Sequence, residues 1–212
     1  MDHYTPASPA PSSIWDQRYA EEEYTYGTLP NEFFQAELAR LQPGTLLVPG
    51  AGQGRDAVYA AEKGWKVYCT DQSNVGCQRA IELAENRGVK IQYIVCDILA
   101  AQYPEASFDL IACIFFHLLG TVRRQFFTDA QRWLKPGGTM LIQSFTPAQL
   151  SNTSGGPKDV DMLATPEILQ SELAGLEVIL CQESEPILSE GKYHQGKANV
   201  VSYVGRKNPG SH

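Results

Sequence analysis

The chain has 212 residues, of which 43% are hydrophobic and 19% charged, values that are ordinary for one soluble globular domain. Its net charge of −7 disfavours nucleic acid as a partner, because binding that polyanion depends on clustered Lys and Arg. No apolar run reaches the ~18 residues that cross a bilayer, so we expect no membrane partner. The 5 cysteines show no metal-ligand spacing. We therefore predict a cytoplasmic protein without a metal site.

Two tails are expected to flank a single domain. Residues 1–13 are rich in Pro, Ser and Ala and predict a disordered tail, as do residues 208–212. The domain then spans residues 14–207. Its first part, residues 14–30, is called the N-terminal cap here because four large aromatic residues precede the first strand.

Helical and strand patterns alternate along the domain. A helical stripe from Phe33 to Leu41 ends at Pro43-Gly44. Four further helices are expected. They run from residue 54 to Gly64, through Ala80 and Ala84 to Gly88, over 122–134 before Pro136-Gly137-Gly138, and from Thr165-Pro166 to Gly175. The apolar runs that predict strands are 46–49, 66–70, 91–96, 108–114, 139–145, 176–183 and 198–206.

The last two runs leave no room for a crossover helix, so they predict an antiparallel pair. The expected fold class is therefore α/β, a doubly wound, seven-stranded and mostly parallel sheet with an antiparallel C-terminal hairpin.

A glycine loop and two acids mark one edge of this sheet. The loop, Gly50-Ala51-Gly52-Gln53-Gly54, follows the first strand, while Asp71 and Asp97 follow the second and third. In open α/β sheets, ligands bind beyond the carboxyl ends of the strands. Glycine allows a ligand to approach the backbone, and the start of the next helix offers free N–H groups. With one carboxylate for ribose hydroxyls and one for an adenine amino group, the pattern predicts an adenosine-bearing cofactor.

The glycine spacing decides between cofactors. A dinucleotide fingerprint has its third glycine where this chain has Arg55, so NAD is disfavoured. Over residues 45–145 the chain instead resembles the class I S-adenosylmethionine (SAM) methyltransferases. Trp15, Arg18 and Tyr19, Val48-Pro49, and residues 191–196 around His194 look more specifically like the thiopurine and tellurite-resistance branch. That resemblance implies a Rossmann-like methyltransferase fold, SAM as cofactor, S-adenosylhomocysteine as product, and a small, soft acceptor such as a thiol or chalcogen oxyanion.

The same resemblance implies that Trp15 packs against the cofactor, under a cap formed by residues 14–30. Arg55 and Asp56 are interpreted as surface residues of a first helical turn, although Arg55 is also placed to reach a cofactor carboxylate. The full set of expected cofactor contacts is Trp15, Gly50, Ala51, Gly52, Gly54, Arg55, Asp71, Gln72, Asp97, Ile98 and Phe115.

The acceptor is expected at the same edge. If strand 176–183 runs parallel to the earlier strands, loop 184–197 emerges there and brings Glu190 and His194 with it. His117 and His194 are candidate catalytic residues, because an oxygen or nitrogen acceptor needs a general base whereas a thiolate does not. The alternative is that His117 is a helix-start or core histidine with a satisfied hydrogen bond and that His194 is exposed. Segment 146–157 is either a mobile lid or a solvated loop. Residues expected to border the acceptor are Tyr26, Phe145 and Tyr193.

Three functions are consistent with these patterns. The leading one is a SAM-dependent methyltransferase acting on a small molecule. The second is a SAM-binding module without catalysis. The third, an NAD-dependent oxidoreductase, is opposed by the glycine spacing.

Overall fold

The structure is a computed structural model that describes residues 13–21 and 23–210. The tail expected over residues 1–13 lies outside the described residues except for Ser13, which begins helix α1 (Ser13–Tyr19). Of the tail expected over 208–212, residues 211 and 212 lie outside as well. Residues 208–210 follow the last strand without regular structure.

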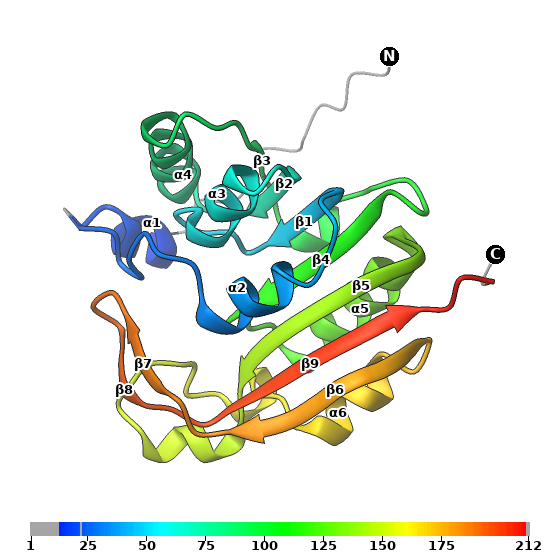
Figure 1. The fold of residues 1–212 in the computed structure, drawn as a ribbon. Coiled ribbons are helices and arrows are strands. Elements are labelled where there is room, and N and C mark those ends of the chain that lie inside the picture. Colours follow the sequence, from blue (N-terminus) through cyan, green and yellow to red (C-terminus); the bar gives the residue numbers. More distant parts are fainter. Residues whose placement is uncertain (1–12, 22, 211–212) are drawn as a thin grey trace.

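A sheet of seven strands in the described part of the chain forms the centre, in the order β3-β2-β1-β4-β5-β9-β6 (Figure 1). Strands β1 to β5 are parallel, and β9 runs antiparallel to both β5 and β6. Strand β6 therefore points the same way as β1, as predicted. The strands are β1 Thr45–Pro49, β2 Lys66–Asp71, β3 Gln92–Val95, β4 Phe108–Ile114, β5 Leu134–Phe145, β6 Leu176–Ser184 and β9 Val200–Lys207.

Helices cover both faces of this sheet, which confirms the doubly wound α/β prediction. In the view of Figure 1, α2 (Glu32–Leu38) and α3 (Arg55–Glu62) lie in front of the sheet, and α5 (Gly120–Trp133) and α6 (Pro166–Glu172) lie behind it. Helix α4 (Asn74–Asn86) packs beside α3 and β3. Short 3-10 helices connect the remaining elements: η1 Ile98–Ala100, η2 Pro147–Ser151 and η3 Val160–Met162.

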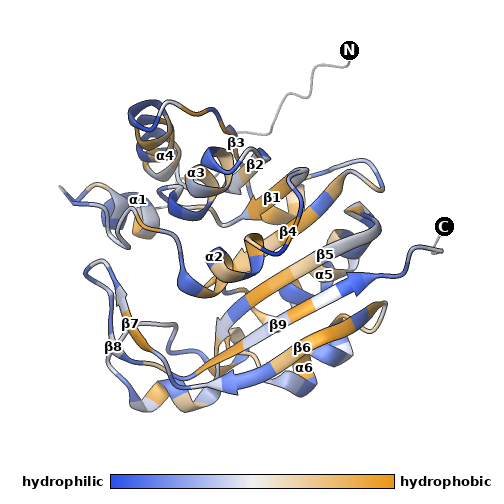
Figure 2. Ribbon diagram, in the orientation of Figure 1, coloured by the Kyte–Doolittle hydropathy of each residue, from blue (hydrophilic) through white to orange (hydrophobic). Residues whose placement is uncertain are grey.

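The core forms one layer on each face. Behind the sheet, Phe126 and Trp133 of α5 pack on Ile111 of β4. In front of it, Phe34 of α2 packs on Leu46 of β1. Figure 2 shows β1 and β4 largely in the hydrophobic colour, which fits central strands that are covered on both faces. This packing holds the carboxyl ends of the strands in place.

Strand β5 differs from the prediction at its start. The expected break at Pro136-Gly137-Gly138 lies inside the strand, which begins at Leu134. The pairing of β4 with β5 jumps from Phe108–Leu134 to Leu110–Thr139, so the intervening residues bulge from the ladder. A left-handed backbone at Gly137 (φ 78°) accommodates that bulge.

The segment predicted as loop 184–197 contains a separate two-stranded hairpin, β7 (Ile187–Glu190) and β8 (His194–Lys197). The prediction was wrong because this short stretch buries only Leu188 and His194 within its strands, too few for an alternating pattern. Helix α6 also ends at Glu172, three residues before Gly175. The hairpin lies at the carboxyl edge of the sheet (Figure 1).

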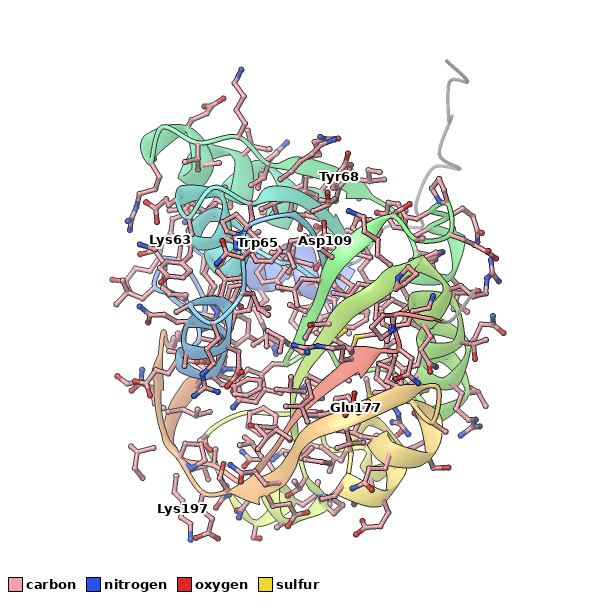
Figure 3. All side chains as sticks on the ribbon, turned by 45° about the vertical axis from the view of Figure 1, so that its right-hand side comes forward. Lys63, Trp65, Tyr68, Asp109, Glu177 and Lys197 are labelled. Atoms are coloured by element: carbon pink, nitrogen blue, oxygen red, sulfur yellow. The ribbon has the colours of Figure 1, made fainter. Side chains whose placement is uncertain are left out.

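The opposite, amino edge is tied by Asp109. Its Oδ2 accepts hydrogen bonds from Thr45 N at 2.8 Å and from Lys135 Nζ at 2.7 Å. Together these contacts hold the pKa of Asp109 below its usual range, outweighing the effect of burial. Figure 3 shows Asp109 far from Lys197, which lies on the hairpin strand β8. Asp109 thus lies at the amino ends of the strands, away from the hairpin at their carboxyl ends.

Candidate functional site

The glycine loop and Asp71 meet directly. Gly52 N donates to Asp71 Oδ2 at 2.9 Å, and Ser73 N donates to Asp71 Oδ1 at 2.9 Å. Tyr93 Oη donates to the carbonyl oxygen of Gly52 at 2.7 Å. The loop adopts left-handed φ angles, among them 85° at Gly54, the residue before α3. Strands β1, β2 and β3 therefore contribute to one site at their carboxyl ends.

Burial raises the pKa of Asp71, while the backbone N–H groups of Ser73, Gly52 and Gln72 oppose that rise. A carboxylate oxygen can accept more than one hydrogen bond. Both Asp71 oxygens therefore retain capacity to accept one from a ligand hydroxyl. The side chain of Gln72 is exposed beside it.

Asp97 follows β3 at the same edge, in an exposed position. Its Oδ1 accepts a hydrogen bond from Leu99 N at 2.8 Å, which caps the short helix η1 where Ile98 lies. Cys96 N donates to the carbonyl oxygen of Asp71 at 2.9 Å, so the two acids lie on adjacent strand ends. Their predicted roles toward a cofactor stay predictions.

The N-terminal cap lies over this edge, with α1 packed against α4 (Figure 1). Tyr19 stacks on Trp15 with ring centroids 5.6 Å apart, and a Cβ added to Gly52 would lie 2.7 Å from the Tyr19 hydroxyl. Asp16 Oδ1 accepts hydrogen bonds from Ser73 Oγ and, at 3.2 Å, from Val75 N at the start of α4. The cap is thus fastened above the glycine loop.

Arg55 does not lie at the surface. Its Nη2 is 2.9 Å from Glu190 Oε2, and both side chains are 11% exposed. Asp56, 7% exposed, accepts a hydrogen bond from Asn31 N at 2.7 Å. The interpretation of Arg55 and Asp56 as surface residues was wrong, because the first turn of α3 faces the cap and the β7–β8 hairpin. Arg55 Nη1 also donates to the carbonyl oxygen of Tyr26 at 3.2 Å.

Asn31 and Gln143 belong to this network and were missed from the sequence. Asn31 Nδ2 donates to Gln143 Oε1 and to Glu190 Oε1, each at 2.8 Å, while its Oδ1 caps α2 by accepting from Phe34 N. Burial alone would raise the pKa of Glu190, but the hydrogen bond from His194 and the charge of Arg55 hold it at about 2. An N-cap signal at Asn31 was the available clue.

His194 sits in an aromatic box. Its ring centroid lies 4.6 Å from those of Tyr26 and Phe115 and 5.4 Å from that of Phe145. His194 Nδ1 is 3.0 Å from Glu190 Oε2. The side chain is buried, so the exposed alternative for His194 was wrong. Burial lowers its pKa, an effect that Glu190 only partly offsets.

Arg18 links the cap to this box. Its guanidinium carbon lies 5.1 Å from the ring centroid of Trp15 and 4.9 Å from that of Tyr193. Its Nη1 donates to Tyr26 Oη at 3.1 Å. Tyr26 and Tyr193, both expected to border the acceptor, have centroids 6.3 Å apart.

His117 lies next to the aromatic box, against Phe145. Its ring stacks on Phe145 at 5.4 Å and 10°, and its Nδ1 is 3.4 Å from Ser144 Oγ. Burial lowers the pKa of His117 to about 4, so the ring is neutral at physiological pH. The side chain of His117 is only partly exposed, and its candidate catalytic role stays a prediction.

Segment 146–157, expected as a lid or a solvated loop, is held by a buried glutamine. Gln149 Nε2 donates to Ser154 Oγ and to the carbonyl oxygen of Gly155, each at 3.0 Å, and its Oε1 accepts from Asn199 N at 2.8 Å. A Cβ added to Gly155 would lie 2.8 Å from His194 Cδ2. This segment therefore forms one wall of the aromatic box.

A groove of about 1130 Å³ reaches the same network from the front of the sheet. It runs between α2 and the hairpin strand β7, and Gln143, Gln182 and Ser202 line it where they pair across β5, β9 and β6. Glu190 and Tyr26 also line it. Within residues 13–21 and 23–210, no cluster of three His, Cys, Asp or Glu is arranged to hold a metal ion.

Comparison with known sequences finds similarity over the central part of the chain. Residues 47–138 match a family model described as a methyltransferase domain. Phosphoethanolamine N-methyltransferase of Plasmodium falciparum (isolate 3D7) is 31% identical over 109 residues, 49% of this chain and 40% of that protein. A probable chloroplastic tocopherol O-methyltransferase of Oryza sativa subsp. japonica is 26% identical over 151 residues, 69% of this chain. The chain spans 40% of the length of each of these curated relatives.

Solved structures share the fold over most of the chain. A structure titled for conversion of a disulfide bond into a thioacetal group during echinomycin biosynthesis has a TM-score of 0.75 at 21% identity, covering 94% of this chain and 93% of that one. TehB from Haemophilus influenzae has a TM-score of 0.70 at 20% identity, covering 84% and 62%. The [4+2]-cyclase SpnF has a TM-score of 0.67 at 16% identity, covering 94% and 93%.

Residues 47–138 thus match a methyltransferase domain, and most of the chain shares its fold with these neighbours. The fold is Rossmann-like, and SAM is the cofactor that the methyltransferase-domain match implies. A cyclase with the same fold shows why the reaction must be argued from the site.

Proposed function

We propose that this protein is a SAM-dependent methyltransferase that acts on a small molecule. The observation that carries the proposal is the contact of Gly52 with Asp71 beneath the N-terminal cap. It places a left-handed glycine loop, a carboxylate and aromatic rings at one sheet edge, which suits an adenosine group. The methyltransferase-domain match over residues 47–138 covers the same loop and strand ends.

The residues present fit SAM. Asp71 retains acceptor capacity for ribose hydroxyls, and the start of α3 offers N–H groups to a carboxylate. Trp15 and Tyr19 provide ring surfaces above the loop. Bound SAM supplies a methyl group on a sulfonium that a nucleophile displaces in line. The protein's part is to orient the acceptor and exclude water, which contributes roughly 7–11 kcal/mol in favourable cases. We also propose Gln72, Asp97, Ile98 and Phe115 as cofactor contacts, and a cytoplasmic location.

The acceptor has two candidate chemistries. A thiol or chalcogen oxyanion is supported by the resemblance to the thiopurine and tellurite-resistance branch and by the fold shared with TehB. An oxygen or nitrogen acceptor is supported by the curated relatives, whose names describe an N- and an O-methyltransferase. Tyr26, Phe145 and Tyr193 are proposed to border either one, beside His194.

The proposal is tested by titration calorimetry with SAM, S-adenosylhomocysteine and NAD, followed by assays of S-adenosylhomocysteine release. We expect micromolar binding of SAM and loss of affinity in Asp71→Ala. Asp129→Ala is the matched control, since Asp129 pairs with Arg132 on α5 behind the sheet. Binding of NAD alone would overturn the proposal. If SAM binds but no acceptor stimulates release of S-adenosylhomocysteine, the protein is a SAM-binding module without catalysis.

A further inference from the structure

A chain of charged groups links α3 to the aromatic box through the β7–β8 hairpin. Arg55 Nη2 and His194 Nδ1 both contact the same oxygen of Glu190, at 2.9 and 3.0 Å. The other oxygen of Glu190 accepts a hydrogen bond from Asn31 at 2.8 Å. The side chains of Arg55, Glu190 and His194 are all largely buried. Such a buried, fully paired carboxylate is held in one position.

These contacts decide which His194 nitrogen carries the proton. Glu190 is ionised at neutral pH and can only accept hydrogen bonds. His194 is neutral there, so the nitrogen that faces Glu190, Nδ1, must be the donor. Nε2 then carries a lone pair and is a proton acceptor.

Nε2 lies beside Gly155 of segment 146–157, within the aromatic box that includes Tyr26 and Phe145, the residues proposed to border the acceptor. Tyr26 and Phe115 flank the ring, and a Cβ added to Gly155 would lie 3.3 Å from Nε2. The titratable and charged groups that face the ring are Glu190 of β7, Arg55 of α3, Arg18 of α1, Tyr26 of the cap, and His117 after β4.

We propose that Glu190 is a positioning residue that fixes His194 as the general base, and that the acceptor is therefore a protic oxygen or nitrogen compound. This inference rests on the proposed function and deepens it. Nε2 takes the proton from the acceptor O–H or N–H while the acceptor's lone pair forms the bond to the methyl carbon. The carbon–sulfur bond breaks with its electron pair on sulfur, which gives S-adenosylhomocysteine. The imidazolium of His194 then returns its proton to solvent.

A soft acceptor would not need this arrangement. A thiolate or a chalcogen oxyanion attacks without losing a proton in the same step, so a base oriented by a buried carboxylate would have no task. The network is instead typical of sites where a carboxylate holds a histidine in one tautomer for proton transfer.

Phenol and thiophenol form a matched pair for the test, because they differ in the attacking atom and thiophenol is largely ionised at neutral pH. Ethanolamine and tellurite extend the panel. We expect S-adenosylhomocysteine release with phenol or ethanolamine to fall roughly 10²–10⁴-fold in His194→Gln, and SAM affinity to be retained. The inference would be overturned if only thiophenol or tellurite stimulated S-adenosylhomocysteine release and His194→Gln did not change that rate. The proposed function would then still stand.

Glu190→Gln separates positioning from mere packing. Loss of the carboxylate charge lowers the pKa of His194 further, so we expect kcat to fall with KM little changed and the acid limb of the pH profile to move to lower pH. Glu185→Gln is the control, an exposed glutamate that pairs with Lys197 beside the same hairpin. An unmoved acid limb in Glu190→Gln would overturn the positioning role.

Imidazole ¹⁵N NMR gives a readout that does not depend on turnover. In the full-length protein without SAM, we expect His194 to carry its proton on Nδ1, in wild type and in Glu185→Gln. Glu190→Gln should show a mixture of both tautomers. A wild-type proton on Nε2 would overturn the inference even if methyl transfer is observed.

Discussion

Replacement of Arg55 by methionine tests the buried network most directly. The substitution keeps an unbranched apolar stem but removes the guanidinium that pairs with Glu190, and it leaves Glu190 and Asp56 buried without their cation. Breaking a buried ion pair by removing one partner costs about 3–5 kcal/mol. The exposed pair of Arg40 with Glu37, in which Arg40 is 71% exposed, predicts at most about 1 kcal/mol for Arg40→Met.

The pH dependence of this loss follows from Glu190. In the folded protein its pKa is lowered to about 2 from an ordinary 4.5, so its ionised form stabilises the fold above pH 4.5, and this contribution is lost as the pH falls toward 2. Each pH unit below 4.5 removes about 1.4 kcal/mol from the wild type. Without Arg55 the pKa of Glu190 rises and that part of the acid sensitivity shrinks.

Urea unfolding followed by circular dichroism measures both effects. We expect the Arg55→Met loss to be largest at pH 7 and smaller by at most about 1.4 kcal/mol at pH 3.5, since the hydrogen bond from His194 still lowers the pKa of Glu190. A loss no larger than that of Arg40→Met, or one that does not change with pH, would refute the assignment of a buried, stabilising carboxylate at this position.

Further variants probe other contacts. Asp71→Ala should weaken SAM binding by about 1–3 kcal/mol in calorimetry, and unchanged affinity in a folded variant would remove Asp71 from the site. Arg123→Met should lower the free energy of unfolding by about 3–5 kcal/mol, because Glu172 is left buried with only the longer, 3.8 Å contact to the exposed Arg124, and a loss below 1 kcal/mol would contradict this. Gly191→Ala (φ 64° at Gly191) places a Cβ 2.4 Å from the Thr25 carbonyl oxygen, so it should raise hydrogen exchange across the cap while the central strands stay protected; uniform protection would count against it.

The sheet could be predicted from sequence because its signals are local and repeated. Apolar runs bounded by Gly and Pro predicted all seven described strands of the sheet within a few residues, apart from the start of β5 at Leu134. Asp71 and Gly52 were singled out because parallel strands end at one edge, and the structure places them in hydrogen-bond contact.

The residues around the aromatic box were harder to predict from the sequence, because their contacts join distant segments. Asn31 and Gln143 are 112 residues apart, and neither stands out in its own segment. Arg55 was misjudged as a surface residue because a first helical turn is normally solvated, whereas here the hairpin strand β7 covers it. The hairpin itself, with few buried residues, gives almost no periodic pattern to read.

The meeting of the β7–β8 hairpin with the N-terminal cap has a consequence for how the protein is made. Lys192 and Tyr193 contact Glu21 across more than 170 residues of chain, and Lys192 N bonds to the carbonyl oxygen of Thr25. During synthesis the cap emerges before the hairpin, and about 170 residues must follow Glu21 before this neighbour exists. The strand ends that carry the glycine loop and Asp71 are therefore synthesised well before the hairpin that closes the aromatic box.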